Sequence, residues 1–187
     1  AVSCSTTRVL QDDQYRLSKN KIEVTNDKDF NVTQLQPYIQ QKPNSYFIFG
    51  WNPFLNVYNW SNGKGKAWDK LVQKIGVAPV VYDASMDDES IEDIVNHLEY
   101  LGYYGSKAES QIKLNKRRVD VTYKVTLGKR YPISRIDLTL PERGEFRQAY
   151  LADSSAVTIR EGDFLSEEAL EKETERSASA MRNQGFF

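Results

Sequence analysis

The sequence contains few side chains that could act as nucleophiles, general bases or metal ligands. One cysteine and one histidine occur among its 187 residues. A single thiol cannot form an internal disulfide, and a cysteine-based metal cluster needs several thiols. Cys4 and His97 are also too few to supply a nucleophile, its base and an orienting group. We therefore expect no catalytic residue, no metal site and no cofactor.

Long apolar runs and a strong charge of either sign are also missing. No stretch approaches the roughly 20 apolar residues that a membrane-spanning helix needs. The formal net charge is −1, so no overall basic field attracts nucleic acid. A content of 40% hydrophobic and 27% charged residues is typical of a folded protein. These absences exclude nucleic acid as an expected partner and favour a folded domain.

Paired carboxylates are the remaining route to catalysis. Four acidic residues gather around one predicted helix start, and an aromatic-rich stretch before them could form a sugar-binding platform. However, acidic side chains in a first helical turn are favoured by the helix dipole alone. A carbohydrate-binding or carbohydrate-active protein is therefore the less favoured alternative to a binding protein without catalysis. The four residues are Asp83, Asp87, Asp88 and Glu89.

Two segments of the chain end alike. The sequence Leu98-x-x-x-Gly102-Tyr-Tyr matches Met181-x-x-x-Gly185-Phe-Phe, and each follows an acidic stretch that begins with serine, at Ser85 and Ser166. Repeats of this kind indicate that one structural unit is used twice. Apolar residues at helical spacing predict an amphipathic helix over 86–101, which Gly102 ends. The matching helix is expected over 166–184.

Alternation of apolar and polar residues predicts strands on either side of the first helix. Residues 118–127 alternate without a break, and the turn at 115–117 joins them to residues 107–114 as a hairpin. Further strands are expected over 20–25 and 133–140. A helix over about 31–41 has two equally good N-caps, Asn31 and Thr33, because Pro37 would lie inside the helix that Asn31 begins. Residues 44–83 are expected to be irregular.

The order of strand, helix, helix, strand and strand resembles the POTRA (polypeptide-transport-associated) domain. The most specific similarity is the junction Val119-Asp-Val-Thr-Tyr-Lys-Val-Thr-Leu-Gly128-Lys-Arg-Tyr131-Pro-Ile133-Ser-Arg-Ile136. There, one module ends in a long strand and a glycine turn, and the next begins with an aromatic residue and an isoleucine-bearing strand. The resemblance implies an α+β fold of tandem β-α-α-β-β modules. Each module would have a three-stranded mixed sheet covered on one face by two helices.

The resemblance also implies a domain plan. Residues 1–19 would be a tether, 20–130 a first POTRA-like domain with an aromatic insertion at about 44–83, and 131–187 a second domain truncated before its last two strands. Such modules precede the transmembrane β-barrel of outer-membrane assembly proteins of the BamA and TamA type. Cys4 with the 77–83 stretch looks most like a lipoprotein-anchored variant of the TamA branch.

This family implies a scaffold on the periplasmic side of the outer membrane, without enzymatic activity. Its partners would be outer-membrane protein clients or assembly proteins, the C-terminal barrel of the same protein, and the membrane through a lipid on Cys4. No small-molecule substrate is expected. An unpaired thiol in an N-terminal tail is the alternative explanation for Cys4. The arm of a two-partner secretion pore, which serves one dedicated client, is the nearest functional alternative.

The predicted binding mode is the pairing of a client strand with a sheet edge. If 118–127 is the central strand, 107–114 lies at an edge with free backbone donors and acceptors. Lysines near that edge would discourage self-pairing. The insertion either covers the helices as a small aromatic core or forms a docking surface. The predicted edge residues are Lys107, Glu109, Gln111, Ile112 and Lys113, and the candidate docking residues are Phe49, Trp51, Phe54, Tyr58 and Trp60.

Overall fold

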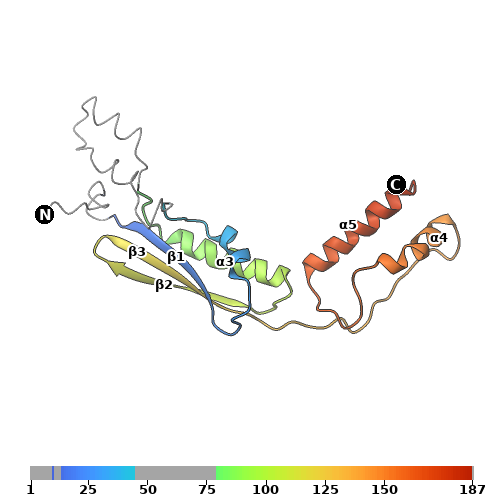
Figure 1. Cartoon of the computed structure of the whole chain (residues 1–187), viewed down its shortest axis with the longest axis horizontal. Coiled ribbons are helices and arrows are strands. Elements are labelled where there is room, and N and C mark those ends of the chain that lie inside the picture. Colours follow the sequence, from blue (N-terminus) through green and yellow to red (C-terminus); the bar gives the residue numbers. More distant parts are fainter. Residues whose placement is uncertain (1–9, 11–13, 45–78, 187) are drawn as a thin grey trace, which may run out of the picture. The chain divides into compact units, whose positions relative to one another are not determined.

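The computed structural model describes residues 10, 14–44 and 79–186. These residues form an α+β structure with one three-stranded sheet, in the order β1-β3-β2 (Figure 1). The strands are β1 (Arg16–Val24), β2 (Lys107–Asn115) and β3 (Arg118–Thr126). The helices are η1 (Val32–Tyr38), α3 (Ser85–Tyr100), α4 (Glu145–Ala152), η2 (Ser154–Ala156) and α5 (Glu167–Asn183).

The chain divides into two compact units. Unit 1 comprises Ala1–Ile94 with Ala108–Val125, and unit 2 comprises Val95–Lys107 with Thr126–Phe187. The sheet and η1 therefore belong to unit 1, whereas α4 and α5 belong to unit 2. Helix α3 contributes its first half to unit 1 and its last turns to unit 2.

The central strand β3 carries the core of unit 1. Val119, Val121, Tyr123 and Val125 are at most 1% exposed, and the residues between them are only partly buried. This is the alternation predicted for 118–127. β1 pairs with β3 in parallel, with Ile22 opposite Tyr123, so the sheet is mixed. Parallel neighbours need a long connection, which here contains η1 and α3.

Helix α3 and η1 cover the face of the sheet on which Tyr123 lies (Figure 1). Ile94 and Leu98, four residues apart on α3, are both fully buried, as the helical spacing predicts. The amide of Gln40 donates to the Ser90 hydroxyl at 3.0 Å, which ties the segment after η1 to α3. The bounds of α3 agree with the predicted helix within one residue.

The first helix differs from its prediction. Residues 31–41 were expected to form an α-helix, but Val32–Tyr38 is a 3-10 helix. Asn31 is the N-cap, and its side chain accepts from the Thr33 amide at 3.1 Å. Pro37 lies inside this helix. A proline lacks the amide that a longer α-helix would use, which accounts for a short helix of the tighter type.

Helices α3 and α5 end in the same way. Gly102 and Gly185 both have φ 89°, a left-handed conformation that glycine adopts without a steric penalty. The Tyr103 amide bonds to the Leu98 carbonyl at 2.8 Å, and the Phe186 amide bonds to that of Met181 at 3.1 Å. In both, the amide of the third residue past the helix bonds to a carbonyl five residues back, which is the Schellman type of C-cap.

The predicted strand at 133–140 does not form. The Tyr131 carbonyl accepts from Leu165, and Ile133 exchanges backbone bonds with residues 162 and 163, but no strand follows within the described residues. Ile136 and Leu138 are 45% and 56% exposed. A strand needs a neighbouring strand to pair with its backbone groups. Beyond Ile133 the Ile136 amide donates to the Glu161 carboxylate at 3.2 Å, and no backbone partner follows in the described part of the chain. Apolar and polar residues do alternate over 133–140, but this pattern does not form a strand without a neighbouring strand to pair with.

The second unit also contains a helix that the sequence did not predict. Residues 145–152, which include Phe146 and Tyr150, form α4. The ring of Phe146 meets that of Phe186 edge-on, with centroids 5.4 Å apart. Ser166 caps α5 by accepting from Ala169, in agreement with the predicted start of that helix.

Two charged groups of α5 hold the preceding loop. Glu173 accepts from the Thr158 amide and hydroxyl at 2.8 and 2.7 Å. Arg176 donates to Glu173 at 2.7 Å and to Asp153 at 2.6 Å. These side chains are 12–24% exposed, so solvent screens them less than it would a surface pair.

Candidate protein-binding edge

β2 lies at the edge of the sheet, as predicted. Its one neighbour in the sheet is β3, and no described residue bonds to the other side of its backbone. A row of free amides and carbonyls along a strand is a template for pairing with another chain. The strand is nine residues long, which is enough for several such bonds.

The five predicted edge residues all lie on β2 and are all exposed. Ile112 is 48% exposed and its neighbour Leu114 is 60% exposed. The other four are Lys107, Glu109, Gln111 and Lys113. The sequence therefore located this strand and its exposure correctly.

The geometry of the hairpin fixes which backbone groups point outward. The turn consists of Lys116 and Arg117, with φ 57° at Lys116. In a hairpin with a two-residue turn, the residues next to the turn bond to each other, and the bonding alternates along the strand. The amide of Ile112 consequently points away from β3. A partner strand would meet the amides and carbonyls of Ile112 and of every second residue on either side.

The same register places apolar side chains beside this edge. Residue 114 lies opposite 119, and residue 112 lies opposite 121. Ile112 and Leu114 thus share the face of the buried residues Val119 and Val121, yet they remain about half exposed. An extended partner could bond to the edge and also cover these two side chains.

The other predicted site residues lie outside the described residues. They are Cys4, the predicted lipid attachment site, and the five candidate docking aromatics Phe49, Trp51, Phe54, Tyr58 and Trp60.

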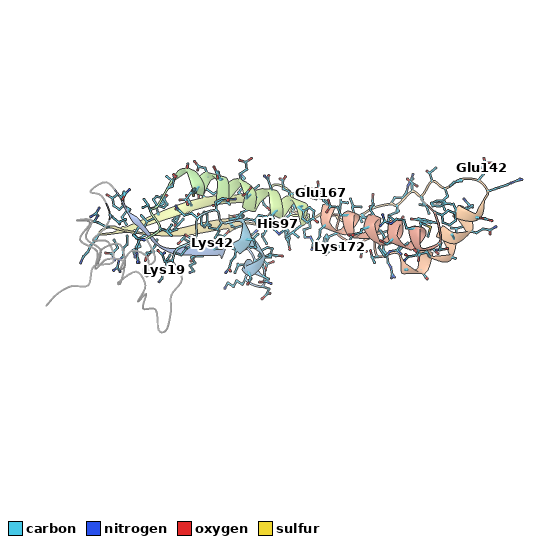
Figure 2. The ribbon with its side chains drawn as sticks, turned by 90° about the horizontal axis from the view of Figure 1, so that it is seen from above. Lys19, Lys42, His97, Glu142, Glu167 and Lys172 are labelled. Atoms are coloured by element: carbon cyan, nitrogen blue, oxygen red, sulfur yellow. The ribbon has the colours of Figure 1, made fainter. Side chains whose placement is uncertain are left out.

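His97 lies on α3 beside the buried Leu98, is itself partly buried, and is labelled in Figure 2. Its ring stacks on Tyr100 with centroids 6.0 Å apart. Burial lowers the pKa of His97, and the nearby Glu168 carboxylate opposes that shift.

The acidic helix start contains a buried cluster that the sequence analysis missed. Asp87 is 3% exposed and accepts from the Tyr82 hydroxyl at 2.6 Å and the Tyr123 hydroxyl at 2.7 Å. Burial, and then the bond to Asp87, raises the pKa of both phenols above its ordinary value. Asp83 instead accepts from Ser85. The two carboxylates thus each accept hydrogen bonds from neighbouring groups of unit 1.

The described residues hold neither a cluster of metal-ligating side chains nor a membrane-spanning helix. They contain no group of three or more histidine, cysteine, aspartate or glutamate side chains that could hold a metal ion. None of their helices has the length and apolar character needed to cross a membrane.

Comparison of the whole chain with protein-family models and with curated proteins found no match.

Proposed function

We propose that this chain is a protein-binding arm of an outer-membrane assembly or translocation protein, built of POTRA-like modules and acting on the periplasmic side. The observation that carries the proposal is the nine-residue edge strand β2. It presents unpaired backbone groups and two half-exposed apolar side chains on one strand. The proposal assigns no catalytic step to the chain.

The sheet order supports the proposal. The mixed order β1-β3-β2 is the one that leaves the second strand at an edge. The identical C-caps of α3 and α5 support a module that occurs twice. The second occurrence lacks a hairpin within the described residues.

The chemistry of the edge suits clients rich in β-structure. Backbone hydrogen bonds recognise any extended chain, and Ile112 and Leu114 favour clients with apolar residues at alternate positions. Unfolded outer-membrane barrel strands alternate in this way. The edge would therefore bind many such clients with little dependence on their sequence.

The remaining parts of the proposal concern anchorage. A lipid on Cys4 would tether the arm to the membrane, and a single acyl chain binds only weakly, so a second element such as a barrel of the same protein would be needed.

Proline at Ile112 tests the edge directly. The substitution removes an outward amide without removing a bond to β3, so the sheet should persist. We expect the full chain carrying Ile112→Pro to bind a urea-unfolded outer-membrane barrel protein about tenfold more weakly, since several backbone bonds would be lost or weakened. Fluorescence anisotropy of the labelled client measures the affinity.

Ile22→Pro is the matched control because it changes the same residue type on the opposite edge strand, β1. It should leave client affinity unchanged, and circular dichroism should show both variants folded. Equal affinities of the wild type and a folded Ile112→Pro variant would contradict the proposal.

A further inference from the structure

A groove opens at the other edge of the sheet. It has a volume of about 820 Å³ and lies between β1 and η1, wholly within unit 1. Ile22 on one wall and Val32 and Pro37 on the other give it an apolar lining. Ile22 and Val32 are half-buried and Pro37 is exposed. The short 3-10 helix thus covers this side of the core only in part.

The backbone of β1 beside the groove has free outward groups. At the start of the strand, the outward Leu17 amide bonds to Val80, and Tyr82 bonds to the Tyr15 carbonyl. At its end, Thr25 donates toward Val125 on β3, so by alternation the amide of Ile22 points away from β3. The structure gives no backbone bond from any described residue to this outer side between Asn20 and Val24.

A polar group in the groove wall lacks a partner. The Asn20 amide group Nδ2 donates to the Gln41 carbonyl at 2.5 Å, which fixes the orientation of the side chain. Its Oδ1 is buried and has no hydrogen-bond partner in the described part of the chain. An unpaired buried acceptor is unfavourable, so a donor that enters the groove at Asn20 would stabilise a complex.

The charge lining the groove is positive. Lys21 and Lys42 line it, and no aspartate or glutamate does. Lys21 contacts Glu23 at 2.5 Å, whereas Lys42 is exposed and has no ion pair among the described residues. The position of Lys42 after η1 and that of Lys19 on β1 are labelled in Figure 2.

We propose that the groove between β1 and η1 binds an extended acidic segment of a partner protein, which adds to β1 as a further strand. The outward amide of Ile22 would bond to the segment's backbone. Alternate apolar side chains would fill the space between Ile22 and Pro37, and a carboxylate would meet Lys42. This combination of strand edge, apolar lining and lysine charge fits an acidic peptide better than a basic or uncharged one.

The proposal is independent of the β2 edge. The groove and β2 lie on opposite edge strands of the sheet, so the protein could hold an unfolded client on one edge and an acidic partner on the other. A negative result for client binding at β2 would not contradict the proposal for the groove. A negative result at the groove would likewise not contradict the proposal for β2.

The test uses the full chain and two peptides with blocked termini, one alternating glutamate with valine and one alternating lysine with valine. We expect the glutamate peptide to bind at least about tenfold more tightly at roughly 0.15 M salt. Its binding should shift the amide resonances of residues 20–24 and 32–43 and leave those of β2 unchanged. Nuclear magnetic resonance titration gives both the affinity and the site.

Two pairs of variants locate the interaction. Lys42→Glu should weaken binding of the glutamate peptide about tenfold, whereas Lys19→Glu makes the same charge change on β1 outside the groove and should have an effect below about twofold. Ile22→Pro should weaken binding and Ile112→Pro should not. Equal binding of the two peptides, an unaltered affinity of Lys42→Glu, or shifts along β2 would each overturn the proposal. Self-association of the chain that Lys42→Glu abolishes would also overturn it, by identifying a second copy as the occupant.

Discussion

The hydroxyl of Tyr123 donates a 2.7 Å hydrogen bond to the carboxylate of Asp87, and the two residues are 1% and 3% exposed. The bond joins the central strand to the first turn of α3. Tyr82 donates to the other carboxylate oxygen at 2.6 Å, and the Tyr82 amide bonds to Tyr15 just before β1. One buried carboxylate therefore connects the helix, the central strand and the segment beside β1.

Tyr123→Phe should destabilise unit 1. The substitution keeps the ring but removes one of the two hydroxyl donors to a buried carboxylate, a loss of about 1–3 kcal/mol. Urea denaturation measures the free energy of unfolding. Tyr15→Phe is the control, because Tyr15 is 39% exposed, and it should change stability by less than about 0.5 kcal/mol. A Tyr123→Phe variant as stable as the wild type would show that the bond contributes nothing net.

Glu173 should make the stability of unit 2 depend on pH. The bonds from Arg176, followed by those from Thr158, lower the pKa of Glu173 from 4.5 to about 2. Because the folded pKa lies below the unfolded one, the stabilisation is fully present above about pH 5 and is lost as the pH falls toward 2. Amide hydrogen exchange in α5 across that range measures the loss.

Glu173→Gln should remove this dependence, since glutamine does not titrate. Glu142→Gln is a control with the same charge change at an exposed residue, labelled in Figure 2, and it should keep the wild-type pH profile. If Glu173→Gln also kept that profile, the acid sensitivity of α5 would have another source.

The elements that sequence predicted well are those whose pattern is local. The unbroken alternation from Val119 to Val125 specified both the strand and its buried face, and Gly102 specified the end of α3. The edge position of β2 followed from a hairpin whose second strand is central. None of these inferences needed knowledge of distant contacts.

The errors came from interactions between distant residues. Residues 133–140 alternate much as β3 does, but strand formation depends on a neighbouring strand that is not in the pattern. Asp87 looked like a residue placed for the helix dipole, and nothing local indicated that Tyr123, far along the chain, would reach it. The groove at β1 depends on the shortness of η1, for which the position of Pro37 was the one available signal.

Gly102 and Gly185 form a natural matched pair. Both have φ 89°, so alanine at either site meets the same backbone strain of about 1–2 kcal/mol. A Cβ at Gly102 would also lie 2.3 Å from the Leu165 carbonyl oxygen, whereas at Gly185 no described neighbour lies within 4 Å. Gly102→Ala should therefore cost about 1–3 kcal/mol more than Gly185→Ala in urea denaturation. Equal costs would mean that the chain at Leu165 moves freely away from Gly102.

The lysines of β2 should keep the exposed edge from pairing with itself. Lys107 and Lys113 are exposed on that strand, and two copies pairing edge to edge would bring like charges together. Replacing both by threonine retains a residue that suits strands and removes the repulsion. The double variant should self-associate about tenfold more strongly than the wild type in sedimentation equilibrium.

A control for this experiment removes the same charge elsewhere. Lys28 and Lys129 are exposed and lie outside the strands, so replacing both by threonine gives an equal net charge with β2 intact. This variant should remain as weakly associated as the wild type. If it associated as strongly as the β2 variant, net charge would govern self-association. The edge itself would then need no protection, which would weaken the case that its backbone is available to a client.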